Sequence, residues 1–126
     1  MQRLSLLILF RDGLHDLNDL EAALTRYREP LQQVAPDHLK FGAPLELDIK
    51  LSSESHVLIE SQEIAEFFPH KDSSAIALCN QRLELSWAMK DDPGLITNLI
   101  GLLEPEVNRL VGKCWTFDPH AGLWFS

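Results

Sequence analysis

The stretch that decides the fold of this chain is LELDIKL, residues 45–51. Leucine or isoleucine occupies every odd position in it, and a charged residue occupies every even one. A repeat of two residues is that of a β-strand with one buried and one solvated face. The stretch therefore predicts a strand in a sheet that has a hydrophobic core on one side.

Further strands are expected on both sides of this stretch. Residues 83–89 alternate in the same way, and residues 4–10 are nearly continuous in Leu and Ile, which is typical of a strand covered on both faces. Short apolar runs at 57–59 and 75–79 predict two more strands. Residues 113–125 predict a closing hairpin, with a glycine at the turn position that needs a positive φ.

Two longer segments have the spacing of amphipathic helices. The first runs from residue 16 to residue 31, with Pro30 expected to kink or end it. The second starts at Pro93 and is closed by Gly112, and Pro105 is a potential break within it. A shorter helix is expected over residues 61–68, before a proline.

Together these elements predict an α+β fold: a single mostly antiparallel sheet with two main helices packed on one face. The other face of the sheet is expected to be partly open and polar. The chain of 126 residues is long enough for a hydrophobic core of its own, so residues 1–126 are expected to form one domain. The first strand, the first helix and strand 45–51 are expected to form a right-handed crossover.

The negative charge of the chain is concentrated in its middle. The formal net charge is −8, and residues 43–72 hold seven acids against two lysines, a balance of −5. A local acidic field repels nucleic acid and anionic membranes and attracts basic proteins or cations. We therefore expect a basic protein partner and no binding to nucleic acid or membrane.

The acids leave two interpretations open, a solvated face or a patch complementary to Lys and Arg on a partner. Phe67 next to Glu66 would give such a patch an apolar anchor, although Phe67 or Phe68 can equally fill the core. Trp124 is expected on the opposite side of the hairpin from Trp115, either exposed or covering the core edge. The candidate partner-binding residues are Glu46, Asp48, Glu60, Glu63, Glu66, Phe67 and Trp124.

No pattern in the sequence predicts catalysis, a cofactor or a metal. The glycines are isolated and form no phosphate-binding loop, and no nucleophile–base motif is present. Cys79 and Cys114 lie far apart and are expected to be buried free thiols. The longest apolar run, residues 6–10, is too short to cross a bilayer, and a cytoplasmic location is the default expectation.

The stretch WTFDPHAGLW, residues 115–124, resembles the aromatic-Asp-Pro hairpin that ends some small bacterial immunity proteins. The resemblance covers about a tenth of the chain, and His120 stands where Gln is expected. It implies an inhibitor that occludes a toxin domain. For a toxin that acts on nucleic acid, carboxylates of the inhibitor would take the place of the nucleic-acid phosphates.

The alternative is a small enzyme or a ligand-binding domain with a site near the end of the first strand. Asp12, His15 and Asp16 gather there, and carboxylates with an imidazole can bind a metal. A polar turn that caps the first helix explains the same residues. An enclosed pocket lined by converging polar groups would favour this alternative.

Overall fold

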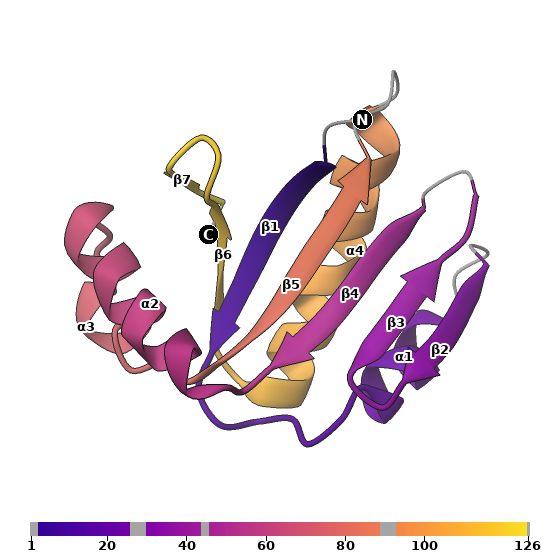
Figure 1. Ribbon diagram of the computed structural model, residues 1–126, viewed down its shortest axis with the longest axis horizontal. Helices are drawn as coiled ribbons and strands as arrows, with labels where there is room; N and C mark the ends of the chain where they lie inside the picture. The colour runs from indigo at the N-terminus through magenta and orange to yellow at the C-terminus, as the bar shows by residue number, and fades with distance from the viewer. Residues whose placement is uncertain (1–2, 26–29, 44–45, 89–92, 126) are drawn as a thin grey trace.

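The computed structural model describes residues 3–25, 30–43, 46–88 and 93–125, which form one seven-stranded sheet with helices on both faces (Figure 1). The strands are β1 (Arg3–Phe10), β2 (Leu31–Ala35), β3 (His38–Phe41), β4 (Leu47–Ser52), β5 (Gln81–Ala88), β6 (Cys114–Asp118) and β7 (Leu123–Trp124). The helices are α1 (Asn18–Leu24), α2 (Ser55–Phe67), α3 (Ser73–Ile76) and α4 (Pro93–Val111).

The strand order is β2-β3-β4-β5-β1-β6-β7, and every neighbouring pair is antiparallel. Because β5 is antiparallel to both β1 and β4, those two strands run parallel to each other, and the same holds for β5 and β6 across β1. The units β1–α1–β4 and β5–α4–β6 are therefore interleaved crossovers, the order of the ferredoxin-like motif. The β2–β3 hairpin extends the sheet beyond β4, and β7 extends it beyond β6.

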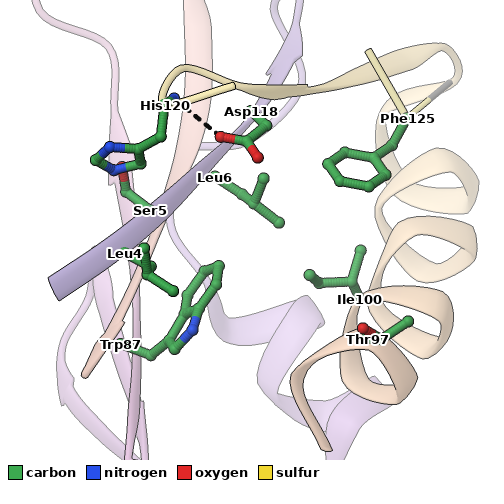
Figure 2. A pocket seen from close by; sticks show the side chains of 9 residues that line it. All are labelled: Leu4, Ser5, Leu6, Trp87, Thr97, Ile100, Asp118, His120 and Phe125. Atoms are coloured by element: carbon green, nitrogen blue, oxygen red, sulfur yellow. Dashed lines mark hydrogen bonds between the residues drawn. The ribbon is translucent and has the colours of Figure 1, made fainter. Parts of the chain in front are cut away.

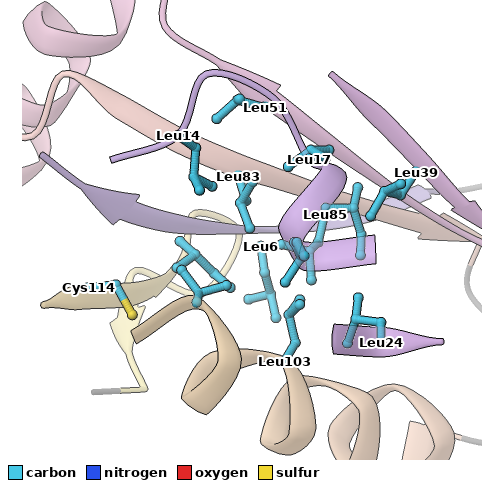
Figure 3. Close-up of a cluster of buried hydrophobic side chains, with 14 of the residues drawn as sticks. Leu6, Leu14, Leu17, Leu24, Leu39, Leu51, Leu83, Leu85, Leu103 and Cys114 are labelled. Atoms are coloured by element: carbon cyan, nitrogen blue, oxygen red, sulfur yellow. The ribbon is translucent and has the colours of Figure 1, made fainter. Parts of the chain in front are cut away.

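The main core lies between the sheet and the pair α1 and α4, which cover one face of the sheet (Figures 1 and 3). Alternate residues of β4 and β5, among them Ile49 and Leu85, point into this core and are fully buried. Leu20 and Leu24 of α1 and Leu103 of α4 meet them from the helix side. The predicted α+β fold, with its antiparallel sheet and two main helices on one face, is confirmed.

The opposite face of the sheet is covered near β1 and β6 and, by α2, at the start of β5. There Leu9 and Trp115 pack against Ile76 and Cys79, which belong to α3 and the segment after it. Over β3, β4 and β5 this face carries polar side chains, including the partly exposed Asp48 and Glu84. This partly open polar face was expected from the alternation in residues 45–51.

Three secondary-structure expectations are wrong. Residues 57–59 belong to α2 and residues 75–79 to α3 and the turn after it, because a short apolar run occurs in a helix as readily as in a strand. The first helix ends at Leu24, and residue 31 begins β2 instead. Strand β3 was not predicted, because its four residues are too few to establish an alternation.

One proline, Pro105 in α4, and one glycine, Gly122 in the closing hairpin, have backbone positions that need explanation. Helix α4 continues through Pro105, whose ring faces the carbonyl of Gly101; both residues are exposed, so water can bind that carbonyl. Gly122 has a φ of +66°, and a Cβ there would lie 2.8 Å from a ring carbon of Phe68. The hairpin therefore requires glycine for its backbone angle and for its contact with α2.

Candidate functional site

Helix α2 has one side turned to the protein and one side turned to solvent. Val57 and Ser61 are buried on the inner side. At about 100° per residue, Ile59, Glu63 and Glu66 fall within roughly 60° of each other on the outer side, with Phe67 beside them. All four are exposed, Ile59 by 56% and Phe67 by 69%. We call these four residues the α2 outer face.

The two carboxylates of the α2 outer face differ from that of Glu60, one helical turn away. Glu60 accepts a hydrogen bond from Arg82 at 3.1 Å, and Arg82 also donates to Glu84 at 2.8 Å. The Arg82 side chain is only 8% exposed, so it is a buried cation between β5 and α2. Within the described part of the chain, Glu63 and Glu66 make no such ion pair. Their charges therefore face solvent, whereas that of Glu60 is partly neutralised.

Asp48 lies apart from these acids, on the open face of β4. Its carboxylate accepts a hydrogen bond from Arg3 at 3.0 Å and contacts His38 Nε2 at 2.7 Å. Glu46 precedes β4 with a φ of +48° and is exposed. The acids that are neighbours in the sequence thus divide between a strand and a helix. The structure brings together Glu63, Glu66 and Phe67 of the predicted set.

Trp124 does not stand apart from the other hairpin aromatics as expected. It pairs with Phe117 across β6 and β7, so both rings point to one side, with centroids 4.6 Å apart. Its indole also packs edge-on against His70 and donates a hydrogen bond to the Phe68 carbonyl at 3.0 Å. Trp124 is therefore partly buried, and it fastens the hairpin to the end of α2. Phe125 is exposed instead.

The Asp12–Asp16 turn borders an open polar cavity of about 560 Å³, and most of the polar groups around it are hydrogen-bonded within the protein. Gln81 accepts hydrogen bonds from the Gly13 and Leu14 amides and donates to the Leu14 carbonyl, while Asn80 binds Asp12. Asp16 accepts the amide of Asn18 in a local turn before α1, whose N-cap residue is Leu17. The described residues contain no group of three metal-ligating side chains.

A second cavity, of about 220 Å³, was missed by sequence reasoning (Figure 2). It lies between the start of β1, the end of β5, α4 and the β6–β7 hairpin, and its walls are mostly apolar. Four sequence-distant segments supply its lining, so no local pattern signals it. The lining residues are Leu4, Ser5, Leu6, Trp87, Thr97, Ile100, Asp118, His120 and Phe125.

At the rim of this cavity Ser5 Oγ lies 3.2 Å from His120 Nε2, a distance at which a base can activate a hydroxyl. A catalytic pair also needs a third group that orients the imidazole. Asp118 is nearby but accepts the backbone amides of His120 and Ala121, at 2.9 and 3.2 Å. The carboxylate thus shapes the turn of the hairpin.

Three ionisable groups, Asp72, Cys79 and Cys114, have pKa values shifted by burial or by hydrogen bonds within the protein. Burial raises the pKa of both Cys79 and Cys114 to about 12, and both thiols are free. The pKa of Asp72 is lowered, first by the hydrogen bond from the Trp115 indole at 3.1 Å and then by Lys113. The cysteines are thiols at neutral pH, which is the unreactive form.

The comparisons with known proteins identify no relative: no family model, no curated protein and no solved structure matches this chain. Among the described residues, no helix is both long enough and apolar enough to cross a membrane.

Proposed function

We propose that this protein is a non-catalytic binding module that docks a basic protein partner through the α2 outer face. The single observation that carries the proposal is Phe67, a large aromatic side chain that is 69% exposed beside two carboxylates without ion pairs among the described residues. Leaving a ring of this size in water costs free energy that burial against a partner would recover.

The make-up of the α2 outer face suits an interface with a Lys- or Arg-rich surface. Phe67 and Ile59 can supply the desolvated anchor, which dominates the binding energy of many interfaces. Glu63 and Glu66 can steer the partner, because complementary charge mainly raises the association rate and fixes orientation. The net charge of −8 adds a long-range attraction for a basic partner.

The anchoring of α2 supports a preformed docking surface. Arg82 binds Glu60 from β5, and the Trp124 indole binds the Phe68 carbonyl just after the helix. The Phe68 ring packs on Phe117, with centroids 5.0 Å apart. A face that is already rigid loses little conformational entropy on binding.

An immunity-like inhibitor of a toxin domain is the concrete form of this proposal. In that form the carboxylates of Glu63 and Glu66 would occupy the partner's phosphate-binding surface and block it. Two features favour contact over chemistry: the imidazole of His120 has no orienting carboxylate within the described residues, and both thiols are un-ionised at neutral pH.

The test is capture of a partner from a lysate of the source organism, followed by binding kinetics with the purified pair. Glu63→Lys with Glu66→Lys should slow association about tenfold at low salt and reduce its salt dependence. Asp19→Lys with Asp37→Lys is the matched control, because it changes the net charge equally at two exposed acids outside α2.

Phe67→Ala should raise the dissociation rate about thirtyfold, the effect of losing a hot-spot side chain. Phe125→Ala, at a ring 60% exposed outside α2, should leave it unchanged. If both charge-reversed pairs slowed association equally, the association rate would depend on net charge alone and not on the α2 outer face. Unchanged kinetics in Phe67→Ala would exclude the α2 outer face as the docking surface. A polyanion such as heparin should compete for the partner.

A further inference from the structure

We propose that the 220 Å³ cavity between β1, α4 and the hairpin is a binding site for a small organic ammonium ion that carries one ring or a short branched hydrocarbon group. The site is separate from the α2 outer face, since α2 and α4 lie against opposite faces of the sheet (Figure 1). The two proposals are therefore independent.

The cavity lies where strands β1 and β6 diverge. Strand β6 pairs with β1 only from Leu7 to Phe10, and the chain then turns away at Asp118. Among the described residues, no strand pairs with the outer edge of β1 at Arg3–Leu6. Leu4 and Leu6 therefore border an empty space instead of a neighbouring strand (Figure 2).

The size of the space and its walls determine what fits. An apolar cavity of about 150 Å³ can hold a benzene-sized molecule, so 220 Å³ accepts one ring with a short chain. The rings of Trp87 and Phe125 lie on opposite sides of the space, with Leu6 and Ile100 between them (Figure 2). Two aromatic walls favour a flat or cationic guest, because their faces attract positive charge.

The polar rim determines the charge of the ligand. Asp118 is the acidic residue that lines the cavity, and its Oδ1 already accepts two backbone amides. A carboxylate next to aromatic faces selects an ammonium group over a carboxylate. His120 is bound to the Ser5 hydroxyl at the same rim, so it marks the mouth of the cavity rather than its charged end.

The test is titration of the full-length protein with three probes that share a phenyl ring and a short chain: 2-phenylethylamine, 2-phenylethanol and 3-phenylpropionate. Binding is followed by calorimetry and by ¹H–¹⁵N chemical shifts. The amine should bind about fivefold more tightly than the alcohol, as expected for one partly solvated charge pair, and the propionate more weakly than both. Shifts should be centred on Leu6, Trp87 and Ile100.

Asp118→Asn should bring the amine and the alcohol to equal affinity, because Asn keeps the oxygen that accepts the backbone amides and loses only the charge. Asp37→Asn, at an exposed acid of the β2–β3 turn, is the control and should keep the fivefold preference. Ile100→Phe should weaken all three probes by filling the cavity, whereas Leu102→Phe on the exposed side of α4 should not.

Absence of binding by the amine, equal affinities in the unaltered protein, or shifts centred elsewhere would each overturn the proposal. So would a charge preference that persists in Asp118→Asn. The probe ranking in the unaltered protein decides the matter even if a variant fails to fold.

Discussion

Replacing Gln81 with Met should destabilise the protein by about 3 kcal/mol. Gln81 is 8% exposed and makes four hydrogen bonds, to the Gly13 amide, the Leu14 amide, the Leu14 carbonyl and the Ser53 hydroxyl. Met has nearly the same volume, so the cavity penalty is small. The loss comes from three backbone groups left without partners, at about 1 kcal/mol each.

Equilibrium unfolding in urea measures this loss. The transition midpoint should fall while the m-value stays constant, because the surface exposed on unfolding does not change. Gln62→Met, at an exposed position of α2, is the matched control and should shift stability by less than about 0.5 kcal/mol. A loss below about 1 kcal/mol in Gln81→Met would refute the idea that this side chain fastens the β1–α1 loop to β5.

Four further results are expected. Cys79 and Cys114, with a pKa of about 12 in place of 9.0, should react with a disulfide reagent at pH 8 about a thousandfold more slowly in the folded than in the unfolded protein. Because unfolding frees these thiols to ionise, urea stability should fall as the pH rises from about 9 toward 12. Asp72 has a lowered pKa, so its contribution to the free energy of unfolding is present above about pH 3.8 and is lost on acidification. In urea titrations, Asp72→Asn should therefore lose less stability than the unaltered protein as the pH falls below 3.8. Gly122→Ala should cost about 2 kcal/mol in thermal or urea unfolding, whereas Gly101→Ala in open space on α4 should stabilise by about 0.5 kcal/mol. Equal effects of the two alanines would contradict the strain assigned to the turn.

Much of the fold could be predicted because local pattern and tertiary burial agree there. The predicted alternation survives over residues 47–51 and 83–88 as the buried and open faces of β4 and β5, while Leu45 and Met89 lie outside the described residues. Helix α4 and the closing hairpin were also expected with nearly their observed bounds. The start of α2 was not, because exposed Ile59 beside buried Val57 removes the helical periodicity.

The candidate site was harder to predict, since it depends on which charges meet in space. Arg82 forms an ion pair with Glu60, and Arg3 forms one with Asp48. The partners are 22 and 45 residues apart in the sequence, so no local pattern reveals either pair. The cavity beside Trp87 has the same origin, because its walls come from both ends of the chain and from α4. Of the three glutamates in α2, Glu63 and Glu66 are exposed, whereas Glu60 is partly buried against Arg82.

The place of β1 between β5 and β6 in the sheet has a consequence for biosynthesis. Its partners, β5 and β6, begin at Gln81 and Cys114, so a ribosome must add about 70 more residues before the first of them exists. At 5–20 residues per second, the Leu- and Ile-rich strand stays unpaired for roughly 4 to 14 s. During that interval its apolar side chains have neither of their two neighbouring strands to pack beside.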